Sequence, residues 1–320
     1  MRQREWKKLK AMVAKLTFGQ RRALKDELAA EDGAAVSVEV IETQAKPAHC
    51  PHCGNDGMVR NGSAHGLQRY KCRNCQRSFN ALTGTPLARL RQKPKWLAQA
   101  DALRDGMTIT QVAKRLKVAR STAFRWRHRF LAQPKTVQAQ ALMGIAEADE
   151  TFFLHSRKGQ CYLDRKPRRR GGRAAKRGLS KEQVPVLVAR DRSGATANLI
   201  LAADGKADLV AALKPLLPLD TILCTDGSSV LAAAVKEIGV THRPVNVSAG
   251  RRVVAGVYHI QNVNAFDSRL KTWIRRFHGV ATRYLDSYLG WFRTLDRFAP
   301  TGLTPASLLG LALGSHSVPT

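Results

Sequence analysis

Two aspartates and an asparagine, far apart along the chain, carry the kinds of oxygen that bind a hard metal ion. Asp149 lies in the strand-like run Ile145–Leu154, and Asp226 comes just after the apolar run Thr221–Cys224. Open α/β sheets bind their ligands at the carboxyl ends of such strands. Asn264 lies on a stretch with helical periodicity. Two carboxylates and an amide oxygen could therefore hold Mg²⁺ against a phosphodiester.

The helix expected around Asn264 also carries basic groups. On a 3.6-residue period, one polar stripe is formed by Asn264, Ser268, Lys271 and Arg275. Lys271, two turns after Asn264, could hold a phosphate. Asparagine leaves one negative charge fewer than a third carboxylate would. Asp267, about 60° beyond the Asn264 edge of the stripe, is the main alternative ligand, and Glu147 or Glu150 could also offset the missing charge.

The charge balance indicates the partner. The 320 residues include 54 Lys and Arg against 24 Asp and Glu, a formal net charge of +30. A charge that large and of one sign favours nucleic acid over other anionic partners. The densest basic run, residues 165–177, is either a solvated loop or a loop that clamps DNA. Taken singly, Asp226-Gly227 is typical of a turn, so the metal-site prediction depends on the combination of features.

Four cysteines predict a zinc ribbon over residues 47–82. They form two Cys-x-x-Cys pairs, and the stretch between Cys53 and Cys72 has the length typical of a four-cysteine zinc site. Two such pairs can direct four thiolates to one tetrahedral ion. In a reducing compartment, clustered cysteines favour metal over disulfides. The predicted zinc ligands are Cys50, Cys53, Cys72 and Cys75.

Residues 90–133 have the pattern of a helix-turn-helix domain, with three helices between 94 and 133. Thr110 is expected to cap a helix that ends at Leu116, and a second, basic helix follows around a core of Phe124 and Trp126. Such a helix fits the major groove of DNA. Its predicted DNA contacts are Arg120, Ser121, Thr122, Arg125, Arg127 and Arg129. An ordinary basic helical hairpin is the alternative interpretation.

The remaining segments complete a multidomain α+β architecture. Residues 1–46 form an N-terminal helical segment. Its two short helices are expected to end near residue 30, where a linker begins. Short apolar runs mixed with helices over residues 143–298 indicate an α/β domain. Residues 299–320 are expected to form a C-terminal tail. The chain has neither an apolar run of the roughly 18 residues that span a bilayer nor an apolar signal core, which predicts an intracellular protein.

Three blocks resemble the catalytic motifs of bacterial insertion-sequence transposases of the DDE type: Asp149-Glu150-Thr151, Thr225-Asp226-Gly227, and His259 through Asn264. The pattern is most similar to insertion-sequence family fifteen ninety-five, the ISXO-two-like type, and covers residues 15–298. This resemblance implies a zinc ribbon and a helix-turn-helix before a ribonuclease-H-like catalytic domain with a mixed sheet. It equates the family's catalytic positions, of which the third is Glu or Asn, with Asp149, Asp226, Asn264 and the downstream basic Lys271.

The resemblance implies a DNA transposase that binds the terminal inverted repeats of its element and catalyses metal-dependent DNA cleavage and strand transfer. The implied cofactors are a structural Zn²⁺ and a catalytic Mg²⁺ pair, with Mn²⁺ as a substitute. Asp149 would bridge both ions, and Asp226 and Asn264 would each complete one. The implied partners are double-stranded DNA at the element ends and target, and further copies of the chain in a homodimer or larger oligomer at the bacterial nucleoid, in the cytoplasm.

Two other functions fit the same residues. A non-catalytic DNA-binding regulator derived from a transposase would account for the missing third carboxylate. A structure-specific DNA nuclease would use the same carboxylates without strand transfer.

Overall fold

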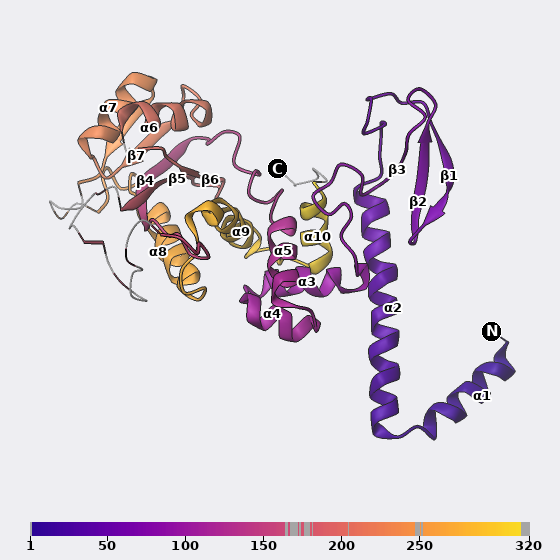
Figure 1. The fold of residues 1–320 in the computed structure, drawn as a ribbon. Helices are drawn as coiled ribbons and strands as arrows, with labels where there is room; N and C mark the ends of the chain where they lie inside the picture. The colour runs from indigo at the N-terminus through magenta and orange to yellow at the C-terminus, as the bar shows by residue number, and fades with distance from the viewer. Residues whose placement is uncertain are drawn as a thin grey trace. The chain divides into compact units, whose positions relative to one another are not determined.

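The computed structural model describes residues 2–163, 182–203, 205–246 and 252–314, together with Lys166, Gly172, Ala174, Ala175, Ser180 and Gly250. Most of the basic run 165–177 therefore lies outside the described residues. The chain divides into two compact units, the first of Met1–Gln133 with Leu303–Thr320 and the second of Pro134–Gly302 (Figure 1). Within the described ranges, no helix has both the length and the apolar character that crossing a bilayer requires.

Two helices open the first unit. They are α1 (Gln3–Ala14) and α2 (Phe18–Gln44). A capping box starts α2, because Thr17 Oγ1 accepts from the amide of Gln20 at 3.3 Å and Gln20 Oε1 accepts from the amide of Thr17 at 2.9 Å. The linker expected from about residue 30 is instead part of α2. Ser37 and Ile41 are buried there, so tertiary packing stabilises a helix that the local sequence favours only weakly.

A small antiparallel sheet follows. Its strands, in the order β1-β2-β3, are β1 (Met58–Ala64), β2 (Leu67–Cys72) and β3 (Ser78–Asn80). Tyr70 on β2 lies opposite Phe79 on β3, and their rings stack with centroids 5.8 Å apart. These rings and the cysteine pairs make up the local apolar core. A core this small leaves a strong need for a further stabilising group.

Three helices form the predicted helix-turn-helix. They are α3 (Trp96–Arg104), α4 (Ile109–Leu116) and α5 (Arg120–Phe130), with the short helix η1 (Lys93–Lys95) before them. Thr108, and not Thr110, caps α4: its amide donates to Gln111 Oε1 at 2.8 Å, and its hydroxyl accepts from the amide of Gln111. Lys117 ends α4 in the left-handed conformation, with φ at 51°, and this turn leads into α5.

The end of the chain returns to the first unit as a helix. Residues 299–320, expected to be a tail, contain α10 (Pro305–Leu313), which packs against α2 and α3. Thr304 caps α10, and Leu308 and Leu309 are buried. The short apolar stretch therefore completes the interior of a unit whose other residues come from the beginning of the chain.

The second unit is built on a mixed five-stranded sheet of order β6-β5-β4-β7-β8. Its strands are β4 (Ile145–Leu154), β5 (Gln183–Asp191), β6 (Thr196–Ile200), β7 (Ile222–Thr225) and β8 (Thr241–Pro244). β5 is antiparallel to both β4 and β6, whereas β7 is parallel to both β4 and β8. The apolar runs Ile145–Leu154 and Thr221–Cys224 predicted β4 and β7. β8 was missed because it is short and mostly exposed, so no apolar run marks it.

Helices cover both faces of this sheet (Figure 1). On one face lie α6 (Lys206–Leu213), the short η2 (Lys214–Leu216) and α7 (Ser229–Ile238); on the other lie α8 (Gln261–Arg275) and α9 (Leu285–Phe298), joined through η4 (Thr282–Tyr284). Ala146 and Ala148 of β4 belong to the apolar core with α6 and α7. Because side chains alternate along a strand, Glu147 and Asp149 lie on the opposite face, the one that α8 covers.

Candidate functional site

The sheet brings Asp149 and Asp226 together. The parallel pairing of β4 with β7 matches Glu147 with Cys224. Asp149 lies two residues beyond this last pair on β4, and Asp226 directly follows the last residue of β7. Gly227, directly after Asp226, has a φ of 82°, and a Cβ there would lie 3.3 Å from Pro244 Cβ. The sharp turn that ends β7 beside Asp226 therefore requires glycine.

The two carboxylates interact electrostatically. Burial raises the pKa of Asp149, and the like charge of Asp226 raises it further. The amide of Glu150 donates to Asp149 Oδ1 at 2.8 Å and, together with the positive charge of Lys271, opposes that rise. Asp149, Asp226 and Lys271 therefore lie within electrostatic range of one another. Carboxylates that repel each other at a strand end are a suitable place for a divalent cation.

Glu147 anchors the helix that covers this face. Its side chain is fully buried, and Oε2 accepts from the amides of Asn262 at 2.8 Å and Val263 at 3.0 Å. These are first-turn amides of α8, which have no partner inside the helix. Arg192 forms an ion pair with Glu147 Oε1 at 2.7 Å. Glu147 thus positions α8 against β4. The sequence offered it only as a possible aid to the metal, and its capping role is visible only in the fold.

Three polar residues of α8 lie within an arc of about 60°. Asn264 and Lys271 are exposed, whereas Asp267 is only 7% exposed. Burial raises the pKa of Asp267 to about 7, and the negative charge of Asp149 contributes to that rise. The structure therefore brings Asp267 into electrostatic contact with Asp149. In the sequence, Asp267 is a weaker candidate ligand than Asn264 because it lies off the polar stripe. Its displacement toward the apolar side of the helix was itself the signal of burial.

The four cysteines fit a zinc ion. Their Sγ atoms all lie within 4.8 Å of one another. The Sγ atoms of Cys50 and Cys75 are 3.6 Å apart, and those of Cys53 and Cys72 are 3.7 Å apart. Tetrahedral zinc with bonds of about 2.3 Å would separate its sulfurs by about 3.8 Å. A disulfide of about 2.05 Å is excluded by these distances, and the geometry is compatible with a zinc ribbon.

The outer face of α5 carries most of the residues predicted to contact DNA. The exposed ones are Arg120, Ser121, Arg125 and Arg129, and Thr122 is half-buried. Arg129 also donates to the carbonyl oxygen of Ala88 at 2.8 Å. A solvent-facing set of cations and hydroxyls on the second helix suits a DNA groove.

Two predicted positions on α5 differ from expectation. Arg127, expected to face DNA, is 1% exposed and donates to the carbonyl oxygen of Met107, so it ties α5 to the segment before α4. Phe124, expected in the core, is 38% exposed, whereas Trp126 is buried as predicted. The reason is that Ala123, Trp126 and Phe130 already fill the inner face of the helix.

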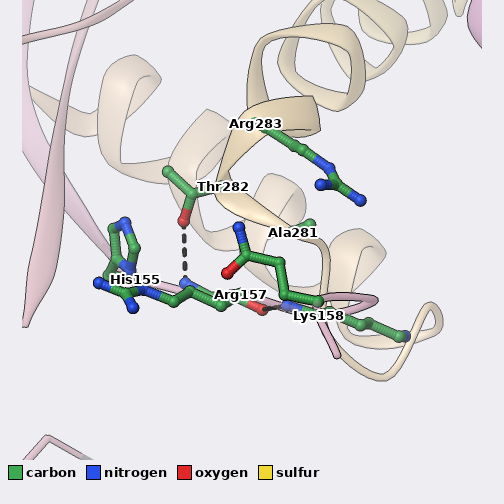
Figure 2. A pocket seen from close by; sticks show the side chains of 8 residues that line it. His155, Arg157, Lys158, Ala281, Thr282 and Arg283 are labelled. Atoms are coloured by element: carbon green, nitrogen blue, oxygen red, sulfur yellow. Dashed lines mark hydrogen bonds between the residues drawn. The ribbon is translucent and has the colours of Figure 1, made fainter. Parts of the chain in front are cut away.

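The second unit also has a basic pocket that the sequence did not predict. It is lined by His155, Ser156, Arg157, Lys158, Gln160, Ala281, Thr282 and Arg283 (Figure 2). Ser156 and Thr282 join its two walls: the Ser156 amide donates to Thr282 Oγ1 at 2.9 Å (Figure 2), and the Thr282 amide donates to the Ser156 carbonyl at 2.9 Å. Lys158 Nζ donates to carbonyls just beyond α8, including that of Gly279 at 2.8 Å. The pocket therefore connects the end of β4 to the segment after α8.

Comparison with known proteins finds two matching domains in this chain. Residues 141–293 match the ISXO2-like transposase domain, and residues 91–134 match a homeodomain-like domain. An uncharacterized protein in transposable element ISH50 of Halobacterium salinarum is 26% identical over 248 residues, which cover 77% of this chain and 84% of that protein.

Solved structures of the Mos1 transposase are also similar. A paired-end complex with the left transposon end is 13% identical, with a TM-score of 0.23, over 63% of this chain and 76% of that one. A pre-cleavage Mos1 transpososome is 12% identical, with a TM-score of 0.20, over 69% and 79% of the two chains.

The two domain matches coincide with the two parts of the chain that carry the predicted motifs. The homeodomain-like match contains α3, α4 and α5, and the transposase-domain match contains the mixed sheet, both aspartates and α8. The chain therefore carries an ISXO2-like transposase domain over residues 141–293, preceded by a homeodomain-like helix-turn-helix domain over residues 91–134.

Proposed function

We propose that this chain is the DNA transposase of an insertion sequence, which binds the terminal inverted repeats of its element and catalyses metal-dependent DNA cleavage and strand transfer. The observation that carries the proposal is that Asp149 on β4 and Asp226, directly after the adjacent parallel strand β7, come from neighbouring segments of a transposase domain. Three antiparallel strands continued by two parallel ones are the arrangement expected of a ribonuclease-H-like domain, which we propose for the second unit.

Asp149 and Asp226 are the proposed carboxylate ligands of Mg²⁺, and Asn264 is a further oxygen donor on the exposed side of α8. A pair of such ions, when bound, activates a water or DNA 3′-hydroxyl and neutralises charge on the leaving oxygen; Mn²⁺ is chemically able to replace Mg²⁺. The protein's own contribution is positional. Glu147 holds the start of α8 against β4, and the exposed Lys271 presents a cation to DNA phosphate beside the carboxylates.

The first unit is proposed to recognise the element ends. Arg120, Ser121, Thr122, Arg125 and Arg129 form the proposed DNA-contacting set on α5. Arg127 is left out of this set because its burial keeps it from solvent. The four cysteines would hold one structural Zn²⁺, whose binding would be coupled to folding of the ribbon. Action as a homodimer or larger oligomer on DNA stays a prediction.

The basic pocket is proposed to hold a phosphate of the bound DNA, at a point where the DNA extends beyond the carboxylate site. Arg157 and Arg283 bring guanidinium groups to its wall. Six strand residues separate Asp149 from His155, which corresponds to about 20 Å of extended chain. A contact at that distance would align the DNA rather than take part in the reaction. Arg283→Ala should therefore weaken binding of longer DNA ends more than of short ones.

The decisive experiment is cleavage of DNA that carries the element's own terminal repeats, with and without Mg²⁺. Asp149→Ala and Asp226→Ala should each remove detectable cleavage and joining while end binding in a mobility-shift assay persists. Glu237→Gln is the matched control, because Glu237 is a half-exposed carboxylate on α7, across the sheet. Cleavage by both aspartate variants would refute the site.

The same assay separates the alternatives. If the wild-type chain binds its element ends but never cuts them, the regulator function is favoured, and the neutral Asn264 is the feature that favours it. Cleavage without any joined product would instead favour a structure-specific nuclease.

A further inference from the structure

Arg192 joins three segments of the second unit that are far apart in sequence. It lies in the turn after β5, and its side chain is 29% exposed. Its Nη1 forms the ion pair with Glu147 Oε1 of β4 at 2.7 Å. Its Nη2 donates to the carbonyl oxygen of Val257 at 3.0 Å, and Nη1 lies 2.6 Å from His259 Nε2. One guanidinium therefore connects β4 to the segment that leads into α8.

The segment before α8 forms a tight turn with a strained tip. The amides of Val254 and Tyr258 each donate to the carbonyl oxygen of the other residue, at 2.8 Å and 2.9 Å. Ala255 and Gly256 at the tip both have a positive φ, 47° and 73°. A positive φ is costly for alanine, and such a conformation persists where the surrounding structure holds it in place. Arg192 supplies such a hold, because the carbonyl oxygen that it binds belongs to this turn.

The same contacts fix the start of α8 close to Asp149. Glu147 Oε2 accepts from the amides of Asn262 and Val263, while its Oε1 is paired with the guanidinium. Glu147 and Asp149 share one face of β4 and are two residues apart, which is about 6.8 Å along the strand. Asn264 directly follows Val263 on α8. The position of Asn264 relative to β4 therefore depends on a carboxylate that the arginine holds.

We infer that Arg192 is a positioning residue of the proposed DNA-cleaving site. This inference rests on the proposed function, in which α8 presents Asn264 and Lys271 beside the carboxylates. In this role the guanidinium orients the helix and does not touch the DNA. Arginine suits the role because its planar fork of donors binds a carboxylate and a carbonyl at once, whereas the single ammonium of lysine cannot span the same partners.

The test is Arg192→Lys in the full-length, zinc-loaded chain, because lysine keeps a positive charge beside the buried Glu147 and removes the fork. The single-turnover rate of cleavage at saturating DNA and Mg²⁺ should fall by at least about tenfold, since a misplacement of about 1 Å can cost about 100-fold. Affinity for the element ends should stay within about twofold of wild type, and the melting temperature within about 4 °C. The amides of Asn262 and Val263 should exchange hydrogen faster, while those of α9 keep their protection.

Arg190→Lys is the matched control. Arg190 lies two residues earlier, on β5, and forms an ion pair of similar length, 2.6 Å, with Asp296 of α9. Among the residues that the structure describes, no hydrogen bond joins Arg190 to the segment before α8. Its cleavage rate should therefore stay within about threefold of wild type.

Four results would overturn the inference. If Arg192→Lys cuts DNA at the wild-type rate, the inference is wrong and the proposed function stands. If the rate falls only together with DNA affinity or melting temperature, Arg192 is a structural residue. If Arg190→Lys loses as much rate as Arg192→Lys, the loss reflects weakened ion pairs in general. If wild type never cuts DNA that carries its element ends, the proposed function and the inference are both overturned.

Discussion

The two candidate metal sites of this chain depend on the protein in opposite ways. The ribbon cysteines lie in a three-stranded sheet with a very small apolar core, and their sulfurs are already spaced as around one zinc ion. The carboxylate site lies on a five-stranded sheet between two helical layers, with a large core of its own. We therefore expect the ribbon to need its proposed zinc in order to fold, and the second unit to fold around mutually repelling carboxylates and to need its proposed metal only in order to act.

Loss of a zinc ligand should have the largest effect. Cys72→Ser should remove the single zinc expected per chain and unfold the ribbon, because structural zinc contributes about 10 kcal/mol in small domains. Metal analysis and amide hydrogen exchange would measure this loss. The second unit should keep its protection, and Cys161→Ser, which changes an exposed cysteine outside the cluster, is the matched control. A ribbon that stays folded without zinc would remove the basis of the contrast.

Breaking the anchor of α8 should have the next largest effect. Glu147→Gln removes the charge that pairs with Arg192 in a fully buried position. We expect the second unit to lose about 3 kcal/mol of unfolding free energy, because breaking one side of a buried pair leaves an uncompensated charge. Urea unfolding followed by the tryptophans of α8 and α9 would measure it. An unchanged midpoint would mean that the charge of Glu147 does not stabilise the second unit.

The buried Asp267 carboxylate should lower the stability of the metal-free protein, and the size of this loss should depend on pH. The pKa of Asp267 is about 7 in the fold, well above its ordinary value of 3.8, so the folded state binds the proton more tightly than the unfolded state does. The cost is absent below about pH 4, grows as pH rises toward 7, and is complete above it. Asp267→Asn should therefore raise the melting temperature of metal-free protein by roughly 4 to 8 °C at pH 8, or about 2 kcal/mol.

At pH 4 the same substitution should change the melting temperature little, because the wild-type carboxyl is already neutral there. An equal gain at both pH values would point to packing rather than charge.

The smallest effects should separate supporting from DNA-facing groups on α5. Arg125→Ala should weaken DNA binding by about 1 kcal/mol and reduce the salt dependence of affinity by about one counterion, with the melting temperature unchanged. Arg127→Ala should do the reverse, because Arg127 is buried against the segment before α4. Fluorescence anisotropy across a salt series would test both. Equal losses of DNA affinity without unfolding would return Arg127 to the DNA-contacting set.

Much of the architecture was predictable from local patterns. The cysteine spacing, the three helices of the helix-turn-helix and the strands that carry Asp149 and Asp226 all depend on residues close together in sequence. The errors share one cause. Arg127 is buried where exposure was expected, Phe124 is exposed where burial was expected, and the expected tail contains α10. Each of these outcomes depends on what packs against the residue rather than on its neighbours in the chain.

By itself, the sequence determined that the chain has a cysteine cluster spaced for zinc, a basic helix-turn-helix and two acidic strand ends, because short-range spacing sets each of these. Only the tertiary structure decided that the strand of Asp149 pairs with the strand that precedes Asp226, that Glu147 caps α8, and that Asp267 rather than Asn264 is buried on that helix. Register between distant strands and the side of a helix that meets a sheet are properties of packing, and packing joins residues more than a hundred positions apart.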